Sequence, residues 1–275
     1  MSVITLTSLC GSPGVSTAAL ALALKWPRQA VVIEADTSRC SSILPGYFEG
    51  STPASKSLIN LALSSAQASL FDANNLWAQF LPLEELAEGE EPTKWVLPGL
   101  LDPRSAPSLD RLWPAIARAA QQLGDTGMDV FIDLGRYVPR DPRFALLENA
   151  DQILFFLRPT LGDAFTFAAR KKEMIEELTE SGRADLPELV TVEHPSSPHS
   201  SKEVASSLGY KLAKELPWDP ALAAMYSEGR TPVLRGKLEK KPYPRAIEDL
   251  VSHLRSNLVD RGQSVTEEEF EEASA

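Results

Sequence analysis

Short apolar runs alternate along the chain with segments in which apolar residues recur every three or four positions. The short runs are typical of buried strands, and the longer period is typical of amphipathic helices. The runs predict seven strands: Val3–Leu9, Ala30–Glu34, Trp95–Leu97, Val130–Leu134, Gln152–Leu157, Leu189–Glu193 and Lys211–Leu216. The periodic segments predict eight helices: Ser16–Lys25, Ser57–Leu63, Leu109–Leu123, Arg143–Asn149, Gly162–Ser181, Ser201–Leu208, Pro220–Ser227 and Pro244–Asn257. This alternation predicts an α/β fold, with a mostly parallel sheet of about seven strands and helices on both faces.

The segment between the first predicted strand and the first predicted helix has the shape of a phosphate-binding loop. Such a loop binds phosphate through inward-turned backbone N–H groups, the positive end of a helix dipole and a lysine. The lysine is missing here, and a tight strand-to-helix turn whose glycines serve geometry alone explains the same residues. The candidate phosphate-binding residues are Gly11, Ser12, Pro13, Gly14, Val15, Ser16 and Thr17.

This loop resembles the deviant Walker A loop of the ParA/MinD family of P-loop ATPases (SIMIBI class), whose pattern is KGGxGKT. In that alignment Cys10 stands at the family's signature lysine and Val15 at its phosphate lysine, so both lysines are absent. The lysine-free loop is also similar to loops of MinD-like proteins from actinobacteria. Because a lysine compensates charge that develops in the transition state, the resemblance implies weak binding of ATP or ADP, or none, and little hydrolysis.

A second segment, residues 31–36, resembles the family's strand that ends in D-x-D. Asp36 stands at the position that orients the attacking water, and Glu34 replaces the first aspartate. The resemblance therefore implies that Asp36 is the catalytic residue if the protein hydrolyses nucleotide.

A third segment, residues 130–135, is similar to the Walker B strand and the switch II that follows it. The resemblance implies that Asp133 holds magnesium through water, that Gly135 approaches the γ-phosphate, and that the Ser16 hydroxyl faces the same metal.

A fourth segment, residues 215–233, resembles the family's IPxDP turn and the GxPV stretch that follows it. It implies that Pro217 and Asp219 line the nucleotide site. The four motifs occur in the family's order over residues 3–257, and together they are far more specific than any one of them.

One cation follows the predicted switch II. Arg136 stands immediately after Gly135 and is a candidate to replace the missing lysine. The alternative is a surface arginine that pairs with a nearby acid such as Asp141.

Composition limits the remaining possibilities. The 275 residues are 43% hydrophobic, and residues 1–260 are predicted to form a single domain. Residues 261–275 are predicted to be an acidic disordered tail, since residues 264–275 carry five glutamates and one aromatic residue. No run approaches the roughly 18 uncharged apolar residues of a membrane span, and the chain starts with a strand instead of a signal sequence. These features predict a cytoplasmic protein without membrane insertion.

The few cysteines and histidines do not form a metal motif. Cys10 and Cys40 are too few for a disulfide framework and are expected to be buried free thiols. His194 and His199 flank a Pro-Ser-Ser-Pro segment and are expected to lie in a solvated loop.

The net charge of −11, of which the tail supplies five negative charges, argues against a nucleic-acid binder as a whole. The segment Arg230–Arg245 nevertheless has five more positive than negative charges. Partition ATPases of the resembled family bind DNA non-specifically through basic surface residues, so this segment is a candidate DNA contact. A solvated loop is the favoured interpretation.

Three hypotheses of function follow from the resemblance. The first is a MinD/ParA-like spatial organiser, a pseudo-ATPase or weak nucleotide binder that localises a protein partner and forms a homodimer or a complex with that partner. The second resembles the TadZ/CpaE proteins, which localise pilus or secretion machinery. The third is a slow but genuine partitioning ATPase with a substitute cation.

Overall fold

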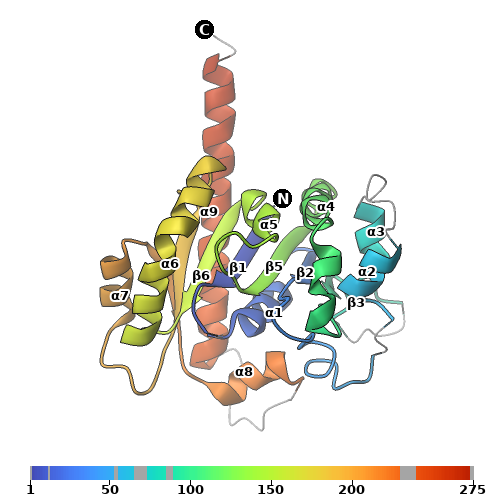
Figure 1. Cartoon of the computed structure of the whole chain (residues 1–275), viewed down its shortest axis with the longest axis horizontal. Coiled ribbons are helices and arrows are strands. Elements are labelled where there is room, and N and C mark those ends of the chain that lie inside the picture. The colour runs from blue at the N-terminus through green and yellow to red at the C-terminus, as the bar shows by residue number, and fades with distance from the viewer. Residues whose placement is uncertain are drawn as a thin grey trace.

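A single sheet organises the computed structural model, which describes residues 2–11, 13–52, 55–64, 73–84, 89–229 and 240–272. Its strands lie in the order β3-β4-β2-β5-β1-β6-β7-β8 (Figure 1). Seven of them are mutually parallel, and only β3 pairs antiparallel, with β4. The strands are β1 (Val3–Ser8), β2 (Ala30–Glu34), β3 (Leu81–Pro82), β4 (Lys94–Leu97), β5 (Asp129–Arg136), β6 (Gln152–Leu157), β7 (Pro187–Val192) and β8 (Leu212–Leu216).

The predicted fold class and all seven predicted strands are therefore confirmed. The eighth strand, β3, is two residues long and contains Pro82, which lacks an N–H for the ladder. A strand so short, with a proline, leaves no alternating pattern in the sequence. It can form at this place because β3 is an edge strand.

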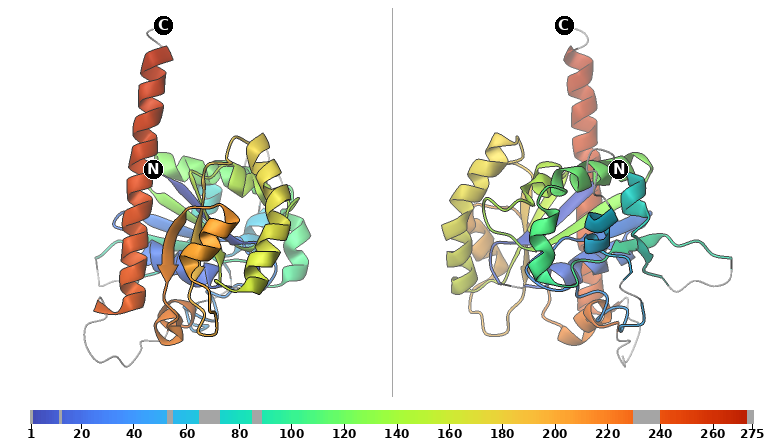
Figure 2. Two further views of the ribbon diagram at one scale, coloured as in Figure 1. Left: turned by 90° about the vertical axis from the view of Figure 1, so that its left-hand side faces the viewer. Right: turned by 45° about the vertical axis from the view of Figure 1, so that its right-hand side comes forward.

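Helices cover both faces of the sheet (Figures 1 and 2). One apolar cluster joins α1, α8 and α9 to one face, and a second joins α2 to α7 to the other. The short α3 and the 3₁₀ helix η2 were not predicted from the sequence. The helices are α1 (Val15–Lys25), α2 (Leu58–Ser64), α3 (Ala73–Trp77), η2 (Pro103–Leu109), α4 (Trp113–Asp125), α5 (Phe144–Glu148), α6 (Leu161–Glu180), α7 (Ser201–Leu208), α8 (Pro220–Ser227) and α9 (Pro242–Glu272).

Helix α1 is buried on nearly all sides, between the sheet and helices α8 and α9. Seven of its eleven residues are buried, and four of these seven are alanines. Alanine favours the helix and lets neighbouring backbones approach closely. The packing of α1 therefore fixes the loop that precedes it.

The order of the strands creates a crevice at the carboxyl end of β1. Strand β1 lies between β5 and β6, and its connection through α1 runs over one face while the connection from β5 through α5 to β6 runs over the other. In open α/β sheets, ligands bind at such a switch point, outside the carboxyl ends of the strands. The sequence motifs of β1, β2 and β5 all meet there.

Helix α9 continues to Glu272, into the residues for which the composition predicts an acidic tail. Its first half is buried against the sheet through Ile247, Leu250 and Leu254, and its last part projects beyond the body of the molecule (Figure 1). Glutamate is a good helix former, and a packed helix is extended without a new nucleation step. A helical backbone up to Glu272 is therefore compatible with the acidic composition of this segment.

Two sequence predictions fall on residues that the structure does not describe. The first concerns Ser12, a candidate phosphate-binding residue. The second concerns the basic segment Arg230–Arg245, of which residues 230–239 lie outside the described residues. Among the helices of the described ranges, none is both long and apolar enough to cross a membrane.

We expect that removal of residues 264–275 leaves the melting temperature within about 2 °C of that of the full chain, because a segment with five glutamates and one aromatic residue has little apolar area to bury. Thermal unfolding followed by circular dichroism measures this. As a control, Leu254→Ala removes a fully buried side chain of the same helix and should cost roughly 2–5 kcal/mol. A loss of several degrees in the truncated chain would show that the segment docks.

Candidate functional site

The loop after β1 turns sharply into α1 at Gly14. This residue has φ +89°, in the left-handed region, and no side chain caps the helix. A Cβ atom built on Gly14 would meet no atom within 4 Å, so open space lies in front of the loop. Since the first N–H groups of a helix have no partner within it, this end of α1 can receive an anion.

Both positions that the resemblance assigns to lysine are buried. Cys10 is 2% exposed, and its Sγ donates a hydrogen bond to the carbonyl oxygen of Asp163 at 3.1 Å. Burial, together with the charge of Asp163, raises the pKa of the Cys10 thiol to about 12, so the thiol is uncharged. Val15 is 4% exposed and belongs to the apolar cluster around α1, although it also borders the pocket in front of the loop.

Asp133 and Gly135 both lie in the carboxyl-terminal half of β5, which continues beyond the predicted strand end at Leu134 to Arg136. The buried Asp133 accepts the N–H of Gly135 on Oδ1 at 2.9 Å, and its Oδ2 has no hydrogen-bond partner within the part of the chain described. Burial raises the pKa of Asp133 to about 7, against the effect of the nearby Ser16 hydroxyl. Gly135 has φ +56°, and a Cβ there would lie 2.2 Å from Cγ of Asp36. Only glycine fits so close to that carboxylate.

Asp36, the predicted catalytic residue, lies in the same crevice but is already engaged. Its Oδ1 accepts hydrogen bonds from the N–H and the hydroxyl of Ser38, at 2.9 and 2.6 Å. Its Oδ2 accepts from Nε of Arg39 at 3.0 Å. These three hydrogen bonds leave one of the roughly four acceptor sites of the carboxylate for a water molecule, on Oδ2 beside the guanidinium group of Arg39.

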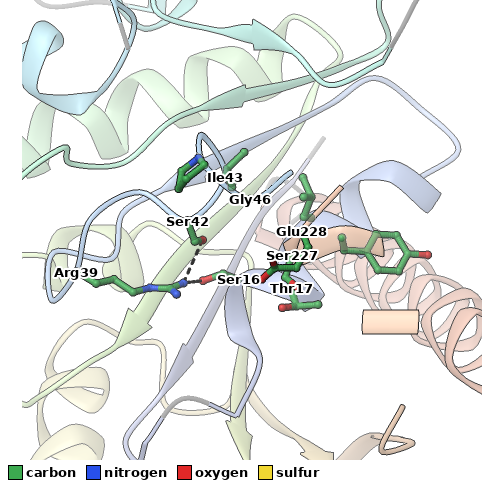
Figure 3. Close-up of a pocket in the computed structure, with 11 residues that line it drawn as sticks. Ser16, Thr17, Arg39, Ser42, Ile43, Gly46, Ser227 and Glu228 are labelled. Atoms are coloured by element: carbon green, nitrogen blue, oxygen red, sulfur yellow. Dashed lines mark hydrogen bonds between the residues drawn. The ribbon is translucent and has the colours of Figure 1, made fainter. Parts of the chain in front are cut away.

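Arg39 connects Asp36 to the phosphate loop. Its Nη2 donates to the hydroxyl of Ser16 at the start of α1, and to Oγ of Ser42 at 3.3 Å (Figure 3). The sequence interpretation did not single out Arg39. Its position three residues after Asp36 was the available signal, but only the folded loop directs the side chain back to α1.

Glu34 holds that loop in place. Its two carboxylate oxygens accept hydrogen bonds from Ser41, from the N–H and hydroxyl of Ser42 at 2.6 and 2.9 Å, and from the N–H of Gly99 at 2.9 Å. Glu34 is 1% exposed. The departure from the family's first aspartate therefore serves as a structural anchor that links the end of β2 to residues 41–42.

A buried arginine binds the ends of β2 and β5 together. The guanidinium of Arg143 donates to the carbonyl oxygens of Ala35 at 3.0 Å, Leu134 at 2.7 Å and Arg136 at 2.9 Å. It also forms an ion pair with Asp141. Asp141, the acid considered above as a partner of Arg136, thus pairs with Arg143 instead. Arg136 is exposed, borders the pocket in front of the loop and has no ion pair in the described ranges.

A further cation that sequence reasoning missed flanks the loop on its other side. Arg158, just after β6, pairs with both oxygens of Asp163 at 2.9 and 3.2 Å. Its Nη2 lies 3.5 Å from the place where a Cβ on Gly11 would be. Three arginine side chains, those of Arg39, Arg136 and Arg158, therefore lie around the lysine-free loop.

Three cavities meet at Thr17. The pocket in front of the loop has a volume of about 210 Å³ and is bordered by Ser16, Asp36, Arg39 and Gly135. A second, of about 320 Å³, shares Gly14 with it and extends to β8 and α8. A third, of about 330 Å³, lies beyond Arg39 and Ser42 (Figure 3). A phosphate chain can thus lie in the first pocket while the rest of a nucleotide lies in a neighbouring one.

Pro217 and Asp219, the predicted nucleotide contacts after β8, line the second pocket together with the exposed Trp218. The carboxylate of Asp219 also caps α8, since Oδ1 accepts the N–H of Leu222 at 3.1 Å. These residues therefore shape the wall of a pocket that adjoins the loop.

The residues present fit magnesium only when phosphate accompanies it. No three or more His, Cys, Asp or Glu side chains form a metal-binding group in the ranges described. Magnesium in nucleotide sites is held by one or two protein oxygens and by the phosphates. The unpartnered Oδ2 of Asp133 is an oxygen of this kind, and the Ser16 hydroxyl becomes one when Arg39 releases it.

The remaining predictions on single residues are mixed. Cys10 is a buried free thiol as expected, whereas Cys40 is free but exposed, which corrects the prediction for it. His194 packs on Trp218 with ring centroids 6.0 Å apart, so it is more than a solvated loop residue.

Known structures share this fold over nearly the whole chain. A ParA family ATPase from Chlorobium tepidum TLS matches with a TM-score of 0.71 and 13% identity, covering 92% of this chain and 99% of that one. The MinD cell division protein of Aquifex aeolicus matches with a TM-score of 0.66 and 14% identity, covering 93% and 98%. An ATP complex of Cyanothece McdA matches with a TM-score of 0.62 and 17% identity, covering 94% and 96%.

By sequence, no protein-family model and no curated protein matches the chain. The structural likeness, at low identity, shows that the chain has the ParA/MinD type of P-loop fold.

We predict that Asp133→Asn changes the pH dependence of stability. The pKa of Asp133 is about 7 in the native state, against an ordinary value of 3.8 for an aspartate. Between these two values Asp133 binds more protons in the folded than in the unfolded state, so its contribution to stability falls as pH rises. The free energy of unfolding of Asp133→Asn, relative to the parent, should therefore increase by roughly 3 kcal/mol from pH 4 to pH 8.

Urea unfolding across this pH range measures the difference. The cost of burying the new amide group is the same at every pH and does not affect the slope. Asp125→Asn, which removes an exposed charge, is the control and should give a nearly constant difference. A constant difference for Asp133→Asn as well would mean that its carboxyl group is already ionised at low pH in the native state.

Proposed function

We propose that the protein is a MinD/ParA-like spatial organiser that binds nucleotide weakly, hydrolyses it little or not at all, and localises a protein partner in the cytoplasm. One observation carries this proposal: a buried carboxylate with an unpartnered oxygen, Asp133, lies beside an open phosphate loop from which both lysines are missing. A turn that served geometry alone would have no need of that carboxylate, which is costly to bury.

Weak catalysis follows from the same residues. A loop without lysine binds phosphate through backbone N–H groups and the helix dipole, but lacks the charge that stabilises phosphoryl transfer. Asp36 is held by Ser38 and Arg39, so the water-orienting group is not free either. These features support binding of ATP or ADP without efficient turnover.

A protein partner is favoured by apolar side chains near the loop. Leu161 and Phe165 lie one turn apart on α6, with 70% and 79% of their surfaces exposed. Since both lysine positions are buried, nucleotide shared between two subunits would contribute little to a homodimer. We therefore propose that such a dimer, or a complex with another protein, depends on apolar contacts and is constitutive.

Two alternatives remain within the same fold. A TadZ/CpaE-like factor would use the same weakened site to localise pilus or secretion machinery. A slow ATPase would use an arginine at the loop as the substitute cation, and Arg136, Arg39 and Arg158 border the pockets there. Non-specific DNA contact through Arg230–Arg245 is disfavoured by the net charge of −11.

Calorimetric titration of the full chain with ATP and magnesium, followed by single-turnover hydrolysis, tests the proposal. We expect measurable but weak binding and no rapid formation of ADP. Sustained turnover would favour the slow-ATPase alternative. If ATP gives neither binding heat nor thermal stabilisation, the loop is only a structural turn and the proposal is wrong.

A lysine placed at Val15 should strengthen the site. Val15 borders the phosphate pocket, and a charge-assisted hydrogen bond from a lysine to phosphate contributes about 1.5–3 kcal/mol. We expect Val15→Lys to tighten ATP binding roughly tenfold or more, without appreciable hydrolysis, because Asp36 remains engaged.

Calorimetry measures the affinity of this variant, and Val15→Met is the matched control for the longer, uncharged side chain. If both variants bind ATP equally, the new ammonium group does not reach the phosphates and the pocket is not a phosphate site. Cys10→Lys should instead lose stability, since it would place an ammonium group where a buried thiol now lies.

A further inference from the structure

The guanidinium group of Arg39 lies among oxygen atoms that the ParA/MinD resemblance assigns to magnesium and water. Its Nε donates to Oδ2 of Asp36 at 3.0 Å, and its Nη2 donates to the Ser16 hydroxyl (Figure 3). Ser16 is the predicted metal-facing hydroxyl, and Asp36 is the predicted water-orienting carboxylate. A positive charge of this chain is therefore already present where the resembled family uses a metal ion.

The surroundings of Arg39 are suited to a cation. Three carboxylates lie at this edge of the sheet: Glu34 ends β2, Asp36 follows it by two residues, and Asp133 lies within β5, opposite Glu34 in the strand register. Glu34 is saturated by hydrogen bonds, whereas Oδ2 of Asp133 has no hydrogen-bond partner in the described chain. A charge that balances these groups therefore stabilises the crevice.

The position of Arg39 is fixed by its own loop. Asp36 binds both Ser38 and Arg39, and Glu34 holds Ser42, which also accepts a hydrogen bond from Arg39. Its Nη1 donates no hydrogen bond to any described residue, so two N–H groups of the planar fork are available to a ligand. The pocket of about 210 Å³ that Arg39 borders also contains Gly14 and Ser16 of the loop.

We propose that Arg39 replaces the magnesium ion in this site, as a built-in cation that contacts the phosphates of a bound nucleotide. This inference rests on the proposed nucleotide binding, and it adds that the binding does not depend on a metal. A guanidinium group carries one positive charge where magnesium carries two, so it supports binding better than it supports phosphoryl transfer. Magnesium could enter the same place only if Arg39 withdrew.

ATP titrations in EDTA and in magnesium test this inference on the parent chain and on Arg39→Gln. We expect the parent to bind ATP with affinities that agree within about twofold in the two buffers, and Arg39→Gln to bind at least tenfold more weakly in EDTA and to regain affinity with magnesium. Arg104→Gln is the control, because Arg104 pairs with Asp102 at the surface and its loss changes the net charge equally. If the parent needs magnesium, or Arg39→Gln matches Arg104→Gln in EDTA, the inference is wrong.

A metal titration without nucleotide separates this inference from the proposed function. Manganese binding, followed by electron paramagnetic resonance, should be tighter in Arg39→Gln than in the parent or in Arg104→Gln, because the variant vacates the oxygens of Ser16 and Asp36. If no chain binds ATP in either buffer, the proposed nucleotide binding fails while this comparison still decides whether Arg39 occupies a cation position. Equal manganese binding in all three chains would overturn the inference.

Discussion

Negative charge at the carboxyl ends of β2 and β5 is the constraint on which the site depends. Glu34, Asp36 and Asp133 lie there within a mostly buried crevice, next to a loop that supplies no lysine. Each carboxylate is accommodated differently: Glu34 by four hydrogen-bond donors, Asp36 by Ser38 and an ion pair with Arg39, and Asp133 by a pKa raised to about 7 through burial. The hydrogen bonds of Glu34 and Asp36 and the ion pair with Arg39 determine the shape of the loop between residues 36 and 42.

Arginines from other elements lie around the loop that lacks both lysines. Arg143 holds the ends of β2 and β5 together through three carbonyl oxygens, and Arg158 flanks the loop from the end of β6. A rigid guanidinium fork can bind several oxygens at once, which a single ammonium group on a flexible chain does less well. The loop itself carries no charged side chain, and the guanidinium groups beside it are paired with the carboxylates of Asp36, Asp141 and Asp163.

The proposed loss of turnover follows from the same arrangement. Asp36 already accepts three hydrogen bonds from Ser38 and Arg39, and the two positions that the resemblance assigns to lysine hold an uncharged thiol and an apolar side chain. A site of this kind can still bind a ligand and order the crevice. It would therefore be suited to a protein whose role is to place a partner, with Leu161 and Phe165 as exposed apolar contacts.

The sequence by itself determined the α/β fold, the seven main strands and the glycine-rich turn between the first strand and the first helix, because apolar periodicity and glycine geometry are local properties of the chain. It did not predict β3, whose two residues carry no pattern, or the helical end of α9, whose helix continues from a packed segment. Three contacts are decided only by the tertiary structure: the hydrogen bond from Arg39 to Ser16, the ion pair of Arg143 with Asp141, and the hydrogen bond from the Cys10 thiol to a carbonyl oxygen of α6. These contacts join elements far apart in sequence, or depend on the exact course of a loop, and their charges are set by burial, which no local pattern encodes.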